Sequence, residues 1–192
     1  MGAVFGEIVM TWAGVLAGAP LACTATAGSP HGDLASWGWN GLGQLNAPAS
    51  LPPPQAVAGG SDHTLAVTVD GNVLAWGWNQ SRQCNVPSTL SEVVAVAART
   101  SHSIALKSDG SIVGWGGNLY GQLNVPMAIL PFTAIASGAY HCVAIQSDGL
   151  IWCWGRNNYR QTDVPASVQA VASVSAGLWH TAAIRLDGEV SV

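Results

Sequence analysis

The sequence has little charge. Only 8% of its 192 residues are charged, and six lysines and arginines stand against ten aspartates and glutamates, for a net charge of -4. Neutralising a phosphate backbone requires a basic face, so no nucleic-acid partner is expected. Cysteine is also scarce: the four cysteines form no Cys-x-x-Cys pair, which excludes a zinc knuckle and a thioredoxin-like redox motif. Apolar residues make up 49%, which excludes a disordered tail and allows a sizeable core.

Long apolar runs are nearly absent too. The only one covers residues 8–27, and it lacks both an upstream Lys or Arg and the uninterrupted length of a membrane span. We therefore expect no membrane partner. A cleaved export signal is the alternative interpretation of this segment, and it favours a secreted or extracytoplasmic location without fixing the compartment.

Glycine, proline and tryptophan are abundant. The chain holds 23 glycines, 10 prolines and nine tryptophans. This composition is typical of short strands joined by tight turns, and it predicts an all-β protein.

One pattern recurs four times at a step of 39 residues: Trp-Gly-x-Asn followed by Gln and Pro, starting at Trp37, Trp76, Trp115 and Trp154. The same step separates four histidines, four Asp-Gly pairs and four prolines of the sequence: His63, His102, His141 and His180; Asp70-Gly71, Asp109-Gly110, Asp148-Gly149 and Asp187-Gly188; Pro48, Pro87, Pro126 and Pro165. Because all four sets of residues recur at the same step of 39, the sequence indicates a repeat architecture.

Each unit predicts a small antiparallel sheet. Residues 93–98 form a β-branched strand, and the next segment alternates small and large apolar residues, as a strand buried on both faces does. Small alanines at Ala66, Ala105, Ala144 and Ala183 allow neighbouring sheets to approach. The Asp-Gly pair supplies the positive φ angles of a hairpin turn, and the recurrent Trp lies on the returning strand. Stacking such sheets radially predicts a β-propeller. A parallel β-solenoid is the rival fold, but it would not need a hairpin in every unit.

The unit GxxHTLAVxxDGxVxAWGxNxxxQxxVP resembles the repeat of the regulator of chromosome condensation superfamily over about residues 33–192. Its short form, with Gln-x-x-Val-Pro after WGxN, is similar to the bacterial repeat of β-lactamase inhibitory protein II. The resemblance implies a propeller that acts as a binding platform through one rim, and it implies partner contacts at Tyr140 and Trp179. Superfamily members typically have seven blades, whereas this chain contains about 4.9 units.

The shortfall leaves three arrangements open: a closed five-bladed ring, an open arc completed by another chain, or a fragment of a longer array. Residues 33–192 are predicted to be propeller repeats, and residues 1–32 a degenerate N-terminal repeat or a leader. An open propeller would allow a homo-oligomer, because something must cover its exposed sheet face.

The polar residues that recur in every unit are predicted to have structural roles. The histidines have no fixed carboxylate or cysteine beside them in their own unit, and we expect them to hydrogen-bond backbone groups at strand starts. The Asp-Gly carboxylates serve turns, and no nucleophile elbow or phosphate loop is present. The sequence therefore predicts no enzyme, no cofactor and no metal site.

Candidate binding residues stand where the repeats differ. Asp62, Ser101, Tyr140 and Trp179 precede the four histidines, so one loop changes from polar to aromatic along the chain. Arg82, Arg156 and Arg160 also vary between units. Trp, Tyr and Arg dominate interface energetics. The predicted partner-binding residues are Tyr140, Trp179, Trp39, Trp78, Tyr120 and Tyr159. For Trp39 and Trp78 the alternative is that they cap contacts between blades.

The recurrent tryptophans at 37, 76, 115 and 154 are predicted to be core, because identical residues at every repeat serve packing. Cys142 and Cys153 lie on the two strands of one predicted hairpin, where free buried thiols are favoured over a disulfide.

The functional prediction is a non-enzymatic, protein-binding β-propeller that uses variable rim loops. The alternatives are an inhibitor of an enzyme such as a β-lactamase, a carbohydrate-binding propeller and, last, a guanine-nucleotide exchange factor.

Overall fold

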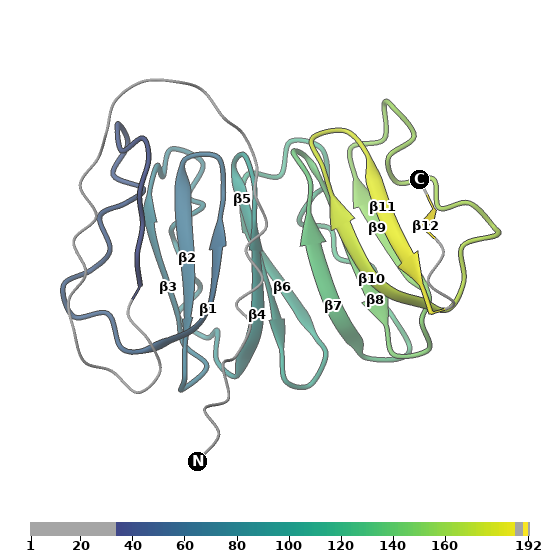
Figure 1. Cartoon of the computed structure of the whole chain (residues 1–192), viewed down its shortest axis with the longest axis horizontal. Helices are drawn as coiled ribbons and strands as arrows, with labels where there is room; N and C mark the ends of the chain where they lie inside the picture. Colours follow the sequence, from purple (N-terminus) through teal and green to yellow (C-terminus); the bar gives the residue numbers. More distant parts are fainter. Residues whose placement is uncertain (1–33, 187–189, 192) are drawn as a thin grey trace, which may run out of the picture.

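Four similar antiparallel sheets, called blades A to D here, follow one another along the chain (Figure 1). The computed structural model describes residues 34–186 and 190–191. Every blade has three strands in chain order. The strands are β1 (Pro54–Gly59), β2 (His63–Thr68) and β3 (Val73–Gly77) in blade A; β4 (Val93–Ala98), β5 (His102–Lys107) and β6 (Ile112–Gly116) in B; β7 (Phe132–Ser137), β8 (His141–Gln146) and β9 (Ile151–Gly155) in C; β10 (Val171–Ala176), β11 (Thr181–Arg185) and β12 (Val190–Ser191) in D.

The middle strands of blades A to C form the most buried layer. Every residue of β8 is buried, and β2 and β5 each have a single residue that is only partly buried. Each middle strand pairs with a strand on both sides and faces a neighbouring blade, which is why its small and large residues alternate. The all-β propeller architecture predicted from the repeat is confirmed.

Large residues of one blade pack on small residues of the next. Leu65 and Val67 of blade A share a core cluster with Ala105 of blade B, and Ile104 and Leu106 of B share one with blade C. The recurrent alanines are 0% exposed in blades A to C and 5% exposed at Ala183. A larger residue at these positions would hold the sheets apart, so the prediction of face-to-face packing is confirmed.

The Asp-Gly turns differ in detail from the expectation. Gly71 has a φ of +73°, whereas Asp70 has no positive φ. The Gly71 amide donates to the Thr68 carbonyl and the Thr68 amide to the Asn72 carbonyl, which defines a three-residue loop that needs one left-handed residue. The Gly71 carbonyl also accepts a hydrogen bond from the Val93 amide of the next blade. The turn therefore joins blades as well as strands.

Each recurrent tryptophan of blades A to C bonds to the preceding repeat. The indole Nε1 of Trp115 donates to the Gln83 carbonyl at 2.8 Å, and the same carbonyl accepts from Ser103 Oγ at 2.9 Å. Trp76 and Trp154 make the equivalent bonds to the carbonyls of Gln44 and Gln122. These three tryptophans are 5 to 7% exposed, so their predicted core role is confirmed. Trp37 is 55% exposed, and its prediction as core is wrong, because no strand pairing holds it among the described residues.

The histidines also connect blades, but through side chains. His63 Nε2 lies 3.0 Å from Ser103 Oγ of the next blade, and His141 Nε2 lies 3.1 Å from Thr181 Oγ1. His102 Nε2 lies 2.7 Å from Ser137 Oγ and 3.3 Å from Cys142 Sγ. The expectation of backbone partners is therefore wrong for the imidazole rings of His63 and His102, whose partners are side chains. A hydroxyl of the next blade is in reach because the blades pack so closely.

Burial keeps these imidazoles neutral. It lowers the pKa of His63 to about 4. The pKa of His102 falls to about 3, through burial and then through repulsion from His63 and His141. Ser103 Oγ donates to the Gln83 carbonyl, so it accepts its second bond from a protonated Nε2 of His63. The Nδ1 of His63 then carries a lone pair, and this buried acceptor has no donor among the described residues.

The described cysteines are free thiols. Cys142 pairs across the sheet with Trp154, and Cys153 pairs with Val143, so the two thiols lie on opposite faces of blade C. Burial raises the pKa of the Cys153 thiol to about 12 and that of Cys142 further. The preference for free thiols over a disulfide is confirmed.

Between residues 34 and 186, and at 190–191, no helix has the length and apolar character that crossing a membrane requires. The predictions for residues 1–32 and for the Asp187-Gly188 turn lie outside the described residues.

Candidate functional site

Two sets of loops meet at one rim of the blades. The first set is the hairpin that joins the first two strands of each blade. In blade C the Gly138 amide donates to the His141 carbonyl at 2.8 Å, which leaves Ala139 and Tyr140 at the tip. Trp179 occupies the equivalent tip in blade D, and Asp62 and Ser101 occupy those of blades A and B. The variable residues before the histidines are thus hairpin tips.

The second set follows the last strand of each blade and carries the WGxN motif. Asn118 Oδ1 accepts from the Leu123 amide, and its Nδ2 donates to Asn124. The buried Gln122 accepts from the Tyr120 amide through Oε1 at 2.9 Å. Gln161 braces Tyr159 in the same way at 2.8 Å. The repeated polar residues therefore fix the loop that presents each variable tyrosine.

The glycine after each tryptophan brings the two loop sets together. Gly116 has a φ of +98°, and a Cβ built on it would lie 2.7 Å from the Ser101 carbonyl oxygen. The next amide along the chain, that of Gly117, donates to the same carbonyl. In blade C the Arg156 amide bonds to the Tyr140 carbonyl at 2.8 Å. Hairpin tips and WGxN loops are therefore held at one rim by backbone bonds.

Four aromatic rings converge on this rim across blades B to D. The ring centroids lie 5.1 Å apart for Tyr120 and Tyr140, 5.6 Å for Tyr140 and Trp179, and 5.7 Å for Tyr159 and Trp179. Two of these contacts are edge to face, the geometry that the ring quadrupoles favour. We name these rings, together with Arg156, the aromatic rim cluster.

Arg156 lies at the centre of the aromatic rim cluster. Its Cζ is 4.6 Å from the Tyr120 ring centroid, 4.9 Å from that of Trp179 and 5.8 Å from that of Tyr140. Its buried Nε has no hydrogen-bond partner, and among the described residues no carboxylate pairs with its guanidinium. The cation is therefore held by aromatic faces, with its charge not neutralised.

The cluster is accessible at its edges. Tyr159 is 65% exposed, and Tyr120 and Trp179 are each 37% exposed, while Tyr140 is partly buried beneath them. An exposed group of rings over a fixed loop frame is suited to contacting a partner surface.

Four of the six predicted binding residues are thus brought together, and two are not. Trp39 is 61% exposed and lies over Gly41 of its own loop. Trp78 is partly buried, and its amide bonds to the Asp62 carbonyl. Neither indole has a ring contact with the aromatic rim cluster in the described part of the chain. They occupy the repeat position of Arg156 in earlier units.

Sequence reasoning noted Arg156 as variable but did not place it among the binding residues. The available signal was its register: position 156 follows the tryptophan and glycine of a unit whose neighbouring loops carry Tyr120, Tyr140 and Trp179. Proximity across three blades becomes visible only when the blades are stacked. In the described residues, no group of three or more His, Cys, Asp or Glu side chains could hold a metal ion.

Comparisons with known proteins agree with this fold. The model of the regulator of chromosome condensation (RCC1) repeat matches residues 55–83, 93–122 and 132–161. These segments contain most of blades A to C with the WGxN loops that follow them. No curated protein sequence matches the chain.

Several solved structures have the same fold. Yeast RCC1 (Prp20) bound to Kap60 gives a TM-score of 0.66 at 22% identity, over 75% of this chain and 44% of that one. Prp20p of Saccharomyces cerevisiae, described with its binding to Gsp1p and histones, gives 0.61 at 19% identity, over 72% and 43%. The receptor kinase CR4 ectodomain of Physcomitrella patens gives 0.59 at 23% identity, over 70% and 38%. The chain therefore spans less than half the length of these matched structures.

The three matched repeats, the four described blades and the likeness to RCC1 propellers all indicate the same fold. The chain thus contains RCC1-like repeats, and its described blades have the β-propeller fold of the RCC1 structures.

Proposed function

We propose that the chain is a non-enzymatic scaffold that binds a protein partner through the aromatic rim cluster. The observation that supports the proposal is the convergence of four aromatic rings from three blades, three of which surround one arginine. Such residues provide most of the binding energy in protein interfaces. The residues that recur in every repeat hold neighbouring blades together. The residues of the aromatic rim cluster differ between repeats, and their side chains make no contact that recurs in every blade.

Tyr159 and Trp179 are the outer anchors of the proposed contact, with Tyr120 beside them and Tyr140 beneath. Loop ordering often consumes binding energy, but these loops are already fixed by buried Gln122 and Gln161. Trp39 and Trp78 remain in the proposal as outlying contacts on earlier repeats. No residue on the rim is proposed to do chemistry.

The charge of Arg156 indicates which side chains a partner should present. A guanidinium with no carboxylate partner among the described residues favours an aspartate or glutamate brought by the partner, next to an apolar or aromatic side chain that covers the rings. We propose a partner with an acidic residue at the centre of its contact surface. Association should then weaken as salt is raised.

Three alternative functions can be tested on the same protein. Inhibition of a β-lactamase rests on the similarity of the short repeat to a bacterial inhibitor, and it would use the same rim. Carbohydrate binding rests on the exposed tryptophans, which can stack on sugars. Guanine-nucleotide exchange rests on the likeness to yeast RCC1, which is a likeness of fold alone at 22% identity.

The experiment compares four immobilised proteins: the unchanged chain, Trp179→Ala, Arg156→Ala and a control, Ile129→Ala. Ile129 is 98% exposed but precedes β7 and therefore lies at the opposite rim from Tyr140. Proteins captured from a source extract are quantified by mass spectrometry, and a candidate is then titrated as a purified protein by calorimetry.

The proposal predicts a protein that the unchanged chain and Ile129→Ala retain equally, and that Trp179→Ala and Arg156→Ala bind at least tenfold more weakly. A purified partner that binds all four proteins alike would refute the rim as the site. Unchanged hydrolysis by a β-lactamase panel at micromolar chain would reject inhibition, and a flat glycan-array response would reject the carbohydrate alternative.

A further inference from the structure

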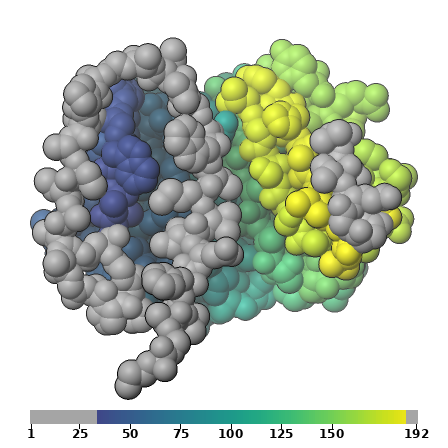
Figure 2. All heavy atoms as spheres, viewed as in Figure 1, coloured from purple at the N-terminus to yellow at the C-terminus, as the bar shows by residue number. Residues whose placement is uncertain are grey.

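The loop that joins blade B to blade C lies beside a pocket of about 550 Å³. The pocket is lined by Val125, Pro126 and Ile129 of this loop, by Phe132 of β7 and by Ile112 of β6. Both blades are internal: blade B also packs on blade A, and blade C on blade D. Figure 2 shows the teal atoms of blade B between the blue atoms of blade A and the yellow atoms of blade D.

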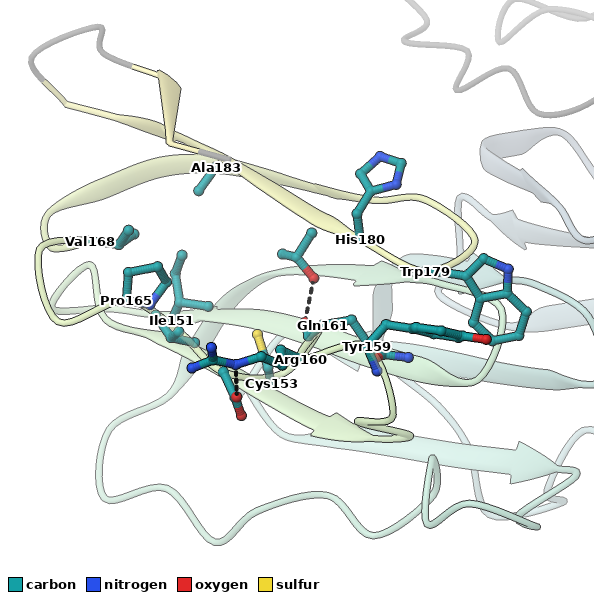
Figure 3. A pocket seen from close by; sticks show the side chains of 13 residues that line it. Ile151, Cys153, Tyr159, Arg160, Gln161, Pro165, Val168, Trp179, His180 and Ala183 are labelled. Carbon is teal, nitrogen blue, oxygen red and sulfur yellow. Dashed lines mark hydrogen bonds and ion pairs between the residues drawn. The ribbon is translucent and has the colours of Figure 1, made fainter.

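The counterpart loops each bury one branched side chain between two blades. Leu90 is 8% exposed and belongs to the core cluster of blades A and B, and Val168 is 7% exposed in the cluster of blades C and D. Val168 lies near Ile151 of β9 (Figure 3). A backbone bond shapes each turn: the Leu90 amide donates to the Pro87 carbonyl at 3.0 Å, and the Val168 amide to the Pro165 carbonyl at 2.9 Å.

The loop from blade B to blade C places a smaller side chain there. Ile129 is 39 residues from both Leu90 and Val168, yet it is 98% exposed. Its neighbour Ala128 packs against the core cluster of blades B and C instead. Thr89 and Ser167, the counterparts of Ala128, are exposed. A methyl group therefore faces the core where the other loops bring a branched chain, and the pocket remains beside it.

Both ends of this loop are fixed as in the other blades. The Val125 amide donates to the Leu123 carbonyl at 2.9 Å, and the Ser147 amide donates to the Pro131 carbonyl at 2.9 Å. The loop from blade A to blade B has the same two bonds at the equivalent positions, with the same number of residues between them. The loop between blades B and C is therefore long enough to follow either path.

Pro131 explains why the loop leaves the path of its counterparts. Glu92 and Ala170, at the equivalent position, have φ angles of +58° and +52°, which a proline ring cannot adopt. A proline weakens the turn without forbidding it. With Pro53 at this position, the Leu51 amide still donates the turn bond at 3.0 Å, although Leu51 is only partly buried.

We propose that residues 126–131, which we call the strap, have two states that open and close the pocket. The structure shows the open state, in which the Leu130 carbonyl accepts a hydrogen bond from Nε2 of buried Gln146 at 3.1 Å. In the closed state Ile129 enters the pocket, its amide donates to the Pro126 carbonyl, and Ala128 turns towards solvent. Removing Ile129 from water favours closure, whereas the fixed φ of proline opposes it.

The strap thus controls access to a pocket at the rim opposite the aromatic rim cluster. The two opposing contributions keep the states close in free energy, so both are populated. This property belongs to one loop only, since the other described loops of this kind make the turn bond.

Thiol labelling of single introduced cysteines tests the proposal. Ile129→Cys and Met127→Cys replace side chains that are 98% and 96% exposed in the open state. Cysteine is apolar enough to be buried. Met127 is the matched control, because its counterparts Ser88 and Ala166 remain exposed in closed loops. Each labelling rate is divided by the rate of the same variant in urea, and mass spectrometry separates the introduced thiol from the native ones.

The proposal predicts that the thiol of Ile129→Cys reacts at least about threefold more slowly than that of Met127→Cys. Adding Pro131→Ala, which supplies the residue type of Ala170, should favour closure and increase the difference to about tenfold. The Met127→Cys rate should not change. Circular dichroism verifies that each variant is folded. Equal rates for the two thiols would overturn the proposal, as would a slow rate that Pro131→Ala leaves unaltered.

NMR tests the same point on the unchanged chain. Ile129 in the closed state is the counterpart of Val168, and Ile112 is the counterpart of Ile151. A nuclear Overhauser cross-peak between the methyl groups of Ile129 and Ile112 is therefore expected. Ile129 methyl shifts at their unfolded values, with no such cross-peak, would overturn the proposal. Neither measurement involves the aromatic rim cluster, so the strap and the proposed partner binding fail independently.

Discussion

Replacing Trp115 with alanine should separate the positions that hold the blades from those that bind. Trp115 is 5% exposed, and a buried tryptophan removes about 200 Å² from water, which corresponds to about 5 kcal/mol of transfer free energy. The Gln83 carbonyl keeps its bond from Ser103 Oγ, so no unpaired acceptor adds to the cost. Allowing for relaxation of the cavity, we expect a loss of about 3 to 5 kcal/mol in the free energy of unfolding.

Two further variants separate the contribution of the indole hydrogen bond from that of burial, and the core from the rim. Trp115→Phe keeps a six-membered aromatic ring but loses the pyrrole ring with its Nε1 hydrogen bond, and should cost less than Trp115→Ala, about 1 to 2 kcal/mol. Trp179→Ala removes a rim indole that is 37% exposed and should cost less than about 1 kcal/mol. Urea unfolding followed by circular dichroism gives all three values. Equal losses for Trp115→Ala and Trp179→Ala would refute the division between core and rim.

Three other predictions concern the repeated elements. The pKa values of His63 and His141 are lowered to about 4, so the unfolded chain, with its ordinary histidine pKa near 6.5, binds more protons between these values. Stability should therefore fall as pH falls from about 6.5 towards 4, by up to about 1.4 kcal/mol per pH unit for each buried histidine, and an unchanged urea midpoint between neutral pH and pH 5 would contradict this. Gly116→Ala should lower the melting temperature strongly, because its Cβ would lie 2.7 Å from the Ser101 carbonyl oxygen, whereas Gly59→Ala, with nothing within 4 Å, should change it little; similar melting curves would be evidence against the close approach. A thiol reagent, with the labelled peptides mapped by mass spectrometry, should modify the partly exposed Cys84 in the native protein and reach the buried Cys142 only after unfolding; early labelling of Cys142 would show that blade C opens.

The repeat predicted the fold because each of its residues has a local or nearest-neighbour purpose. Strand alternation, the Asp-Gly turn and the recurrent tryptophan all act within one unit or between adjacent units, so periodicity alone located β1 to β11 and the contacts between blades. Their place on one rim could be predicted for the same reason: Tyr140 and Trp179 hold equivalent tips, and equivalent tips lie side by side. That they bind a partner stays a prediction.

Other features could not be read from the pattern. The hydroxyl partners of His63 and His141 lie 40 residues away in the next blade, and their selection depends on side-chain geometry between sheets. Trp37 holds the repeat position of the buried tryptophans but lacks their neighbours, because burial depends on how the blades pack together and not on the repeated sequence. Arg156 gains its place in the aromatic rim cluster from three separate loops, a convergence that a one-dimensional register does not display.

Hydrogen exchange of the tryptophan indoles, followed by NMR, tests most directly whether shared positions hold the blades and varied positions remain open. The account predicts slow exchange for the Nε1–H groups of Trp76, Trp115 and Trp154, which are bonded to carbonyls of the preceding repeat, and fast exchange for those of Trp39 and Trp179. Exchange of the three repeated indoles as fast as that of Trp179 would contradict it.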